Sequence, residues 1–247
     1  LIKLSLLILN LELPLELLNM PAAKRAEALI EALIRNIQLV TIELDAEDDA
    51  QVIFETLNAR GAPLTPADLV RNFIFLTAAR QNLDVSQLYS EQWRPFEEEP
   101  PRRPFWKQDE RQGRIKRSRM DLFLFHYVTF RTAEELKIGH LYQAFKDWWE
   151  SSQDRVIESE LHELRRYSHF YRQLLAPDAS NRFGRFSQRM RALDTTTAYP
   201  LVLWIAGEIG SDAAEFFAML DDIESFIIRR AVCGYNQKAY NRLFLES

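Results

Sequence analysis

Cysteine and glycine are scarce in this chain of 247 residues, and their scarcity narrows the functions to consider. Cys233 is the only cysteine, which excludes a disulfide within the chain and argues against a cysteine zinc site. The 7 glycines form no Gly-rich phosphate loop and no nucleophile elbow, and there is no Cys-x-x-Cys pair. His140, His162 and His169 are dispersed, and His126 lies in an apolar run and is expected in the core. The residue pattern therefore predicts no metal site, and it supports no catalytic assignment.

Long apolar runs and a strong charge imbalance are also missing. Lys3, Asn10, Glu12 and Pro14 interrupt the apolar opening of residues 1–18, which is too broken for a transmembrane helix and lacks signal-peptide features. The net charge of −5 gives no global nucleic-acid signature, so any basic surface must be local. With a single cysteine, the chain is expected to be cytoplasmic and to have no membrane partner.

The apolar periodicity predicts a mainly α-helical fold. Before residue 60, a helix is expected over 22–34, a strand over 37–44, where apolar and polar residues alternate, and a helix over 48–58. After residue 66 the helical period dominates throughout. The later helices are expected near residues 66–80, 84–94, 118–130, 134–150, 156–175, 180–193, 196–208, 211–232 and 236–245.

The fold class predicted from these elements is a multi-helix bundle with a small α/β remnant, of one or two strands, near the N-terminus. The corresponding domains are residues 1–60 and residues 61–247. Four prolines, an acidic triplet and a basic end make residues 95–117 the expected long loop of the second domain.

Residues 52–76 predict two helices joined by a tight polar turn. Gly61 suits the left-handed end of the first helix. Thr65 is a good N-cap for the second helix, with Pro66 at its first position and the negative charge of Asp68 in its first turn. The turn is more polar than a helix connector requires. Its polar residues are Asn58, Arg60, Asp68, Arg71 and Asn72.

Residues 102–119 form a locally basic segment, with eight Lys or Arg against two acidic residues. Phosphate contacts need mobile cations, and aromatic rings stack on bases, so the segment is a candidate DNA-contacting loop. The simpler interpretation is a solvated loop that Phe105 and Trp106 anchor to the body. The residues expected to contact DNA in the first interpretation are Arg102, Arg103, Lys107, Arg114, Lys116, Arg117 and Arg119.

Residues 225–242 form a second polar cluster. Cations at the end of an apolar helix suit its negative pole, so helix termination followed by a packed helix is the simpler interpretation. The alternative is a polar junction that docks another domain. The residues expected at such a junction are Arg229, Arg230, Lys238 and Arg242.

The stretch FETLNARGAPLTPADLVRNFIF, residues 54–75, resembles a motif of the GmrSD-type restriction endonuclease family, in its GmrS-like N-terminal part. Three later segments resemble the same family in the same order. They are HLYQAFKDWWE (140–150), TTAYPLVLWI (196–205) and IESFIIRRAVCGYNQKAYNRLF (223–244).

The resemblance implies a ParB-like α/β domain with an Asp-Gly-Gln-Gln-Arg motif tied to nucleotide hydrolysis. A helical region follows it, and often a GmrD-like domain with a His-Asn-His-type nuclease motif. Such proteins cut modified, typically phage, DNA. This chain has neither the Asp-Gly-Gln-Gln-Arg motif nor the nuclease motif, so we expect it to be a segment that lies between them. The polar turn within residues 54–75 is then the only family motif whose residues can be assigned in this chain. The transferred residues are Asn58, Arg60, Gly61, Asp68, Arg71 and Asn72.

Two hypotheses from different classes follow. In the first, the chain is the helical module of a GmrS-like restriction or phage-defence protein, which couples nucleotide-binding and DNA-nuclease domains and contacts DNA. The parent protein is then expected to use a nucleoside triphosphate and a divalent metal, with no cofactor in this segment. In the second, the chain is a non-catalytic helical scaffold that binds another protein. A self-sufficient hydrolase ranks last, and no motif specifies an oligomeric state.

Overall fold

The computed structural model describes residues 64–98, 104–152 and 154–235, together with residues 21, 23–24, 26–28, 30–31, 240 and 244. The chain divides into two compact units, Leu1–Leu57 and Asn58–Ser247. In the first unit, the described residues from 23 to 31 are helical, within the helix predicted over 22–34. The strand predicted over 37–44 and the helix over 48–58 lie outside the described residues.

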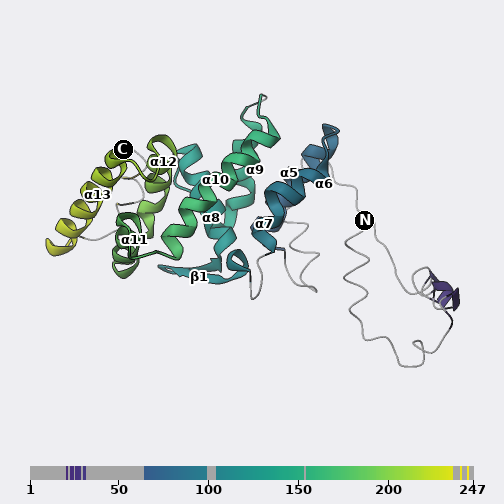
Figure 1. The fold of residues 1–247 in the computed structure, drawn as a ribbon, viewed down its shortest axis with the longest axis horizontal. Helices are drawn as coiled ribbons and strands as arrows, with labels where there is room; N and C mark the ends of the chain where they lie inside the picture. The colour runs from purple at the N-terminus through teal and green to yellow at the C-terminus, as the bar shows by residue number, and fades with distance from the viewer. Residues whose placement is uncertain are drawn as a thin grey trace. The chain divides into compact units, whose positions relative to one another are not determined.

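The second unit consists almost entirely of helices, as Figure 1 shows. The α-helices are α5 (Pro66–Arg80), α6 (Val85–Leu88), α7 (Arg94–Glu97), α8 (Arg119–Thr132), α9 (Leu141–Glu150), α10 (Ile157–Leu175), α11 (Arg182–Ala192), α12 (Tyr199–Ile209) and α13 (Ala214–Val232). Four shorter turns of π or 3₁₀ helix are η2 (Tyr89–Trp93), η3 (Phe105–Lys107), η4 (Ile138–His140) and η5 (Thr196–Ala198). The mainly α-helical fold class is confirmed.

Helix positions agree with the apolar periodicity, and the differences lie at the ends. The helix predicted over 66–80 has those bounds as α5. The helix predicted from residue 134 begins later, at Leu141, because Ala133 ends α8 in a left-handed conformation at φ 53° and η4 intervenes. Of the helix predicted over 236–245, the structure describes Tyr240 and Phe244, both helical.

The prediction of a long loop over 95–117 is wrong for most of the described residues in that range, which are helical or form strands. Asp109–Gln112 (β1) and Ile115–Ser118 (β2) pair as an antiparallel hairpin, with Gly113 at φ +58° in the turn. Gly113 tolerates that conformation because it has no Cβ. The sequence does not predict these strands, because they are polar and show no apolar alternation. Gln112 is their one buried residue.

Helix α8 is the centre of the second unit. It packs against α5, α9, α10 and α12, and in Figure 1 it lies between α5 on one side and α12 on the other. Phe123 on α8 is fully buried and contacts the rings of Phe96, Trp106, Tyr127 and Tyr171. Aromatic side chains contribute large buried areas, so this cluster is expected to dominate the stability of the unit.

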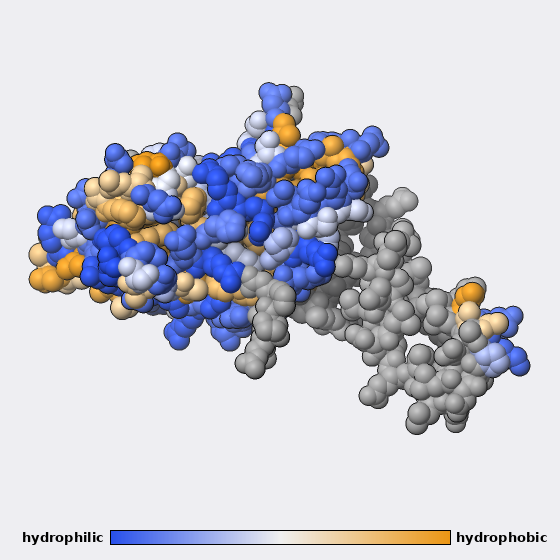
Figure 2. Space-filling model, viewed as in Figure 1, coloured by the Kyte–Doolittle hydropathy of each residue, from blue (hydrophilic) through white to orange (hydrophobic). Residues whose placement is uncertain are grey.

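The surface view in Figure 2 is mostly hydrophilic, with apolar residues gathered toward α13. Met219, Ile228, Val232 and Tyr235 are exposed on this helix and just beyond its end. Within the described part of the chain, no helix combines the length and the apolar character needed to cross a membrane.

Candidate functional site

The N-terminus of α5 contains the described part of the motif turn. Thr65 caps the helix: its Oγ1 accepts a hydrogen bond from the Asp68 N–H at 3.2 Å, and its own N–H donates to the Asp68 carboxylate at 3.1 Å. Pro66 follows at the first helical position. Reciprocal capping satisfies two N–H groups that a helix start otherwise leaves unpaired. The predicted capping by Thr65 is confirmed.

Arg71, one turn further along α5, binds neighbouring carboxylates. Its guanidinium donates to Glu97 of α7 at 2.6 Å and lies 3.7 Å from Asp68. It also donates to the Asn72 side-chain oxygen, at a longer 3.4 Å. Tyr89 donates to the same Glu97 carboxylate, which makes Glu97 a shared acceptor. The described polar residues of the motif therefore fasten α5 to α7 on the protein surface.

Asp121 joins the N-termini of two helices. It lies in the first turn of α8, is only 2% exposed, and accepts a hydrogen bond from the Ala67 N–H of α5 at 2.9 Å. Ser118 caps α8 by accepting from the Asp121 N–H at 3.1 Å. Burial raises the pKa of the Asp121 carboxyl above its usual range, although the hydrogen bonds with Ala67 and Ser118 oppose that shift. Positive helix ends favour a carboxylate at this position.

A small cavity lies where α5 meets the basic segment. Its volume is about 280 Å³, and it opens between the start of α5, helix α7 and the base of the hairpin. Asp68 and Arg71 of the motif lie on one side, and Trp106, Lys107 and Ser118 lie on the other. The fold thus brings together the motif residues and the basic segment, which are far apart in the sequence.

The hairpin and the turn η3 that precedes it hold exposed cations. Within the described residues, none of Lys107, Arg111, Arg114 and Arg117 forms an ion pair with a carboxylate. Lys116 does pair with Asp109, at 3.3 Å, but both side chains are largely exposed, so the pair is weak. Arg111 was not among the residues predicted to contact DNA. Its placement on β1, directly opposite Lys116, adds it to the basic surface.

Like charges directly opposite each other destabilise a hairpin unless an anion lies between them. Arg111 and Lys116 are such a pair. Asp109 offsets only part of this repulsion, through its contact with Lys116. Part of the repulsion between Arg111 and Lys116 therefore remains, and an external anion would relieve it.

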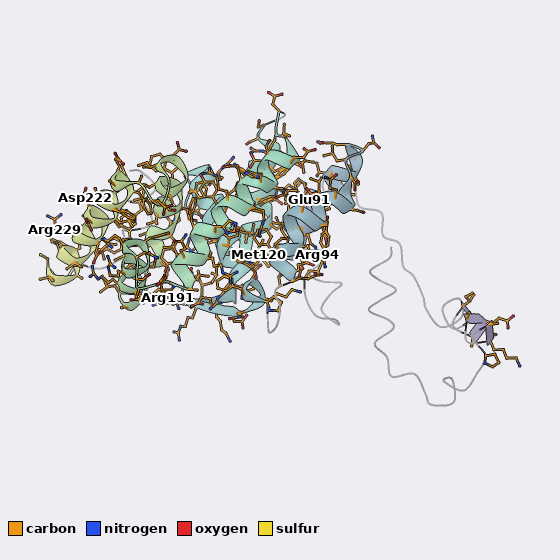
Figure 3. All side chains as sticks on the ribbon, viewed as in Figure 1. Glu91, Arg94, Met120, Arg191, Asp222 and Arg229 are labelled. Atoms are coloured by element: carbon orange, nitrogen blue, oxygen red, sulfur yellow. The ribbon has the colours of Figure 1, made fainter. Side chains whose placement is uncertain are left out.

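Arg119 has a different environment from the other predicted DNA contacts. It is half-buried, pairs with Glu110 at 3.0 Å, donates to Gln108 at 3.0 Å and lies over the Phe105 ring at 4.4 Å. Glu110 also pairs with Arg191 of α11 at 2.9 Å, and Figure 3 shows Arg191 at this end of α11. The ion pairs of Glu110 with Arg119 and Arg191 therefore hold the hairpin against α8 and α11.

The two aromatic residues of the basic segment are anchors. Phe105 and Trp106 are buried, and Trp106 packs against the rings of Phe96, Phe123 and Tyr171. Neither ring is therefore available to stack on a base in this structure. Arg102 and Arg103, which precede them, lie outside the described residues.

The residues predicted to dock another domain are only partly described. Arg229 is exposed and points away from α13 in Figure 3. Arg230 lies over the rings of Phe226, Tyr235 and Tyr240. Lys238 and Arg242 lie outside the described residues, as do Asn58, Arg60 and Gly61 of the motif turn.

The resemblance implies a divalent metal, and the described residues were compared with the donors that such an ion needs. Among them, no three His, Cys, Asp or Glu side chains gather closely enough to hold a metal ion.

Comparison with known proteins gives one match. Residues 7–75 match the family model described as the GmrSD restriction endonuclease, N-terminal domain. The match ends inside α5, so it includes the whole motif stretch. Searches of curated proteins and of solved structures found no match.

Proposed function

We propose that the helices that follow residues 7–75, which match the GmrSD restriction endonuclease N-terminal domain, couple this region to DNA in a restriction or phage-defence protein. The hairpin would bind the phosphate backbone. The junction of α5 and α8 would transmit the bound state to the family-matched region. Nucleotide hydrolysis and DNA cleavage would belong to the ParB-like and nuclease domains of such a protein.

One observation supports this proposal above the others: a short hydrogen-bonded path joins the basic hairpin to the family-matched segment. Ser118 ends β2 and caps α8. Asp121, in the first turn of α8, binds the N–H of Ala67 in the first turn of α5. Ala67 lies within the matched residues 7–75. A shift of the hairpin therefore acts on that segment through few bonds.

Electrostatics support the DNA-binding half of the proposal. A protein that neutralises phosphates releases counterions, and its affinity then falls steeply with salt. Three hairpin cations, Arg111, Arg114 and Arg117, and Lys107 on the preceding turn η3 form no ion pair with a described carboxylate. The chain as a whole has a net charge of −5, so DNA binding requires a locally basic surface such as this one.

The geometry of the motif supports the coupling half. Arg71 is shared between α5 and α7 through its ion pair with Glu97, and the cavity beside it also contacts Lys107. A phosphate bound at Lys107 would lie close to this ion pair and would compete with Glu97 for the guanidinium. Arg71 is therefore the residue whose ion pair is expected to change first when DNA binds.

The test is the salt dependence of DNA binding by the whole chain, measured by fluorescence anisotropy between about 50 and 200 mM salt. The variant Arg111→Gln/Arg114→Gln/Arg117→Gln removes three hairpin charges. The control variant Arg80→Gln/Arg94→Gln/Lys146→Gln removes three charges elsewhere. We expect the log–log salt slope to decrease in magnitude by about 2 to 3 in the hairpin variant and to stay unchanged in the control. Equal slopes in both variants would contradict DNA contact through the hairpin.

A scaffold function is the second candidate, because one observation favours it. Val232, 81% exposed, lies with Ile228 and Tyr235 at the end of α13, where apolar side chains face solvent. Clusters of exposed apolar residues often mark protein-binding surfaces. If the chain binds DNA without salt sensitivity, or not at all, while Val232→Ser abolishes capture by a purified partner domain, the scaffold is the better account.

A further inference from the structure

A second and larger cavity lies at the tip of the hairpin, away from the α5 junction. Its volume is about 650 Å³, within the range of about 300–1,000 Å³ that is usual for small-molecule sites. The hairpin turn, helix α8, turns η4 and η5 and the start of α12 enclose it. Ile115, Phe125, Leu136, Ile138 and Pro200 give it apolar walls.

A chain of buried hydrogen bonds lies at one side of this cavity. His126 and Gln112 both line it. The Nε2–H of His126 donates to the Gln112 Oε1 at 2.8 Å, and the Gln112 Nε2 donates to the Tyr171 hydroxyl at 3.0 Å. This arrangement fixes the imidazole tautomer and leaves Nδ1 with a free lone pair. His126 was expected to be a satisfied core residue, but only one of its nitrogens has a protein partner.

Three buried polar atoms around the cavity have no hydrogen-bond partner. They are His126 Nδ1, Thr197 Oγ1 and the Tyr199 hydroxyl oxygen. His126 and Thr197 line the cavity, and the His126 ring contacts the Tyr199 ring at 5.6 Å. A buried polar atom that is left unpaired destabilises the folded state, because it has lost its hydrogen bonds to water. Native proteins rarely keep several together without a ligand or an ordered water.

The charges around the cavity favour an uncharged ligand. Arg114 and Lys137 supply two positive charges to the lining, and Glu135 and Asp194 supply two negative charges. Their sum is zero, so neither a phosphate nor a cation gains from the surrounding field. His126 is also neutral, because full burial lowers its pKa to about 3.

We propose that this cavity binds an uncharged heteroaromatic ring of nucleoside size, with apolar faces and a hydrogen-bonding edge. The apolar walls would enclose the faces. Gln112, His126 and Thr197, which line the cavity, would meet the edge. The nucleobases share this chemistry, and they reach the cavity either as free nucleosides or as a base extruded from DNA held by the hairpin.

The first arm of the test uses free nucleosides. Adenosine, guanosine, cytidine and uridine are each added to the whole chain, and binding is measured by saturation-transfer NMR. Ile138→Trp places a large side chain at the half-exposed edge of the cavity, and Ile209→Trp makes the same change at an exposed site outside it. The free nucleoside does not need the hairpin cations, so this arm can fail or succeed independently of the DNA-binding proposal.

The second arm uses a DNA duplex with a single 2-aminopurine, whose fluorescence rises when the base leaves the stack. A rise with the native chain and with Ile209→Trp, but not with Ile138→Trp, would identify an extruded base as the ligand. Thr197→Val removes one unpaired hydroxyl at constant shape. It should leave the fold intact and weaken binding about fivefold in whichever arm gives a signal.

Signals in either arm that Ile138→Trp abolishes and Ile209→Trp preserves would support the proposal. The proposal would be overturned if no nucleoside binds and the fluorescence does not change. It would equally be overturned if binding persists unchanged in Ile138→Trp.

Discussion

The Asp121 carboxylate accepts a hydrogen bond from the Ala67 N–H at 2.9 Å, and this bond joins the first turns of two helices that lie 54 positions apart in sequence. Both ends of the bond are buried. The positive ends of α5 and α8 therefore share one carboxylate, beside both the family motif and the basic hairpin. This arrangement gives a physical route from the proposed DNA-binding surface to the family-matched segment.

Removing the Asp121 carboxylate should destabilise the second unit. Asp121→Ala leaves the Ala67 N–H buried and unpaired, at a cost of about 1–3 kcal/mol in the free energy of unfolding. Asp109→Ala is the matched control, because it removes an exposed carboxylate whose ion pair contributes about 0–1 kcal/mol. Urea denaturation measures both variants. Equal stability of the two would contradict the role assigned to Asp121.

Burial of His126 should make stability depend on pH. Its pKa is about 3 in the folded chain against an ordinary value of 6.5. Between these two pH values, the imidazole is therefore protonated in the unfolded chain and neutral in the folded chain. The contribution of His126 is fully present above pH 6.5 and is lost progressively as pH falls toward 3. At about pH 5 the loss amounts to about 2 kcal/mol.

The matched comparison is with His126→Gln, which does not titrate. Between about pH 8 and about pH 5, the native chain should lose about 2 kcal/mol more unfolding free energy than the variant. Parallel pH dependence of the two proteins would show that the buried imidazole is not the cause.

Close approach of Gly207 to Tyr167 should make alanine unacceptable at that position. A Cβ on Gly207 would lie 2.1 Å from the Tyr167 hydroxyl oxygen. The Tyr167 ring is held by Tyr127, Phe130 and Phe170, so it has little freedom to move. Gly207→Ala should lower the unfolding free energy by about 1–3 kcal/mol despite the better helix propensity of alanine.

Gly139 supplies the control for that substitution, because a Cβ there meets no atom within 4 Å. Gly139→Ala is expected to change stability by less than about 0.5 kcal/mol. Thermal unfolding measures the stability of both variants. A Gly207→Ala protein as stable as Gly139→Ala would show that α10 and α12 move apart at this contact with little loss of stability.

Two arginines two positions apart should have separable roles. Arg119→Ala removes the partner of the largely buried Glu110 and should cost about 1–2 kcal/mol of stability, since Arg191 still pairs with that carboxylate. Arg117→Ala should leave stability unchanged, because Arg117 is exposed, but should weaken DNA binding. Melting temperatures and anisotropy of both variants test this; weaker DNA binding by Arg119→Ala without lost stability would reverse the assignment.

Local signals in the sequence predicted much of this fold. Thr65, Pro66 and Asp68 define the start of α5, and apolar spacing sets the bounds of α10 to within one residue. The hairpin was missed because its strands bury little and its register depends on contacts with distant residues, such as the pairing of Glu110 with Arg191. Polar stretches that pack against a helical body lack the alternation by which strands are recognised.

The candidate sites required the structure. The motif residues and the basic segment were each visible in the sequence, but the Asp121–Ala67 bond that connects them spans residues with no local relationship. The cavity at the hairpin tip draws its lining from segments between Gln112 and Pro200. Contacts between residues so far apart in the sequence leave no short sequence pattern from which such a site could be predicted.

Hydrogen exchange with and without duplex DNA tests the central claim most directly. We expect slower amide exchange on DNA binding in two places, the hairpin at residues 109–118 and the first turn of α5 at residues 66–70. Both effects should vanish in Arg111→Gln/Arg114→Gln/Arg117→Gln and persist in Arg80→Gln/Arg94→Gln/Lys146→Gln. Protection of the hairpin with unchanged exchange in α5 would contradict the coupling, and no protection at either place would contradict the DNA contact itself.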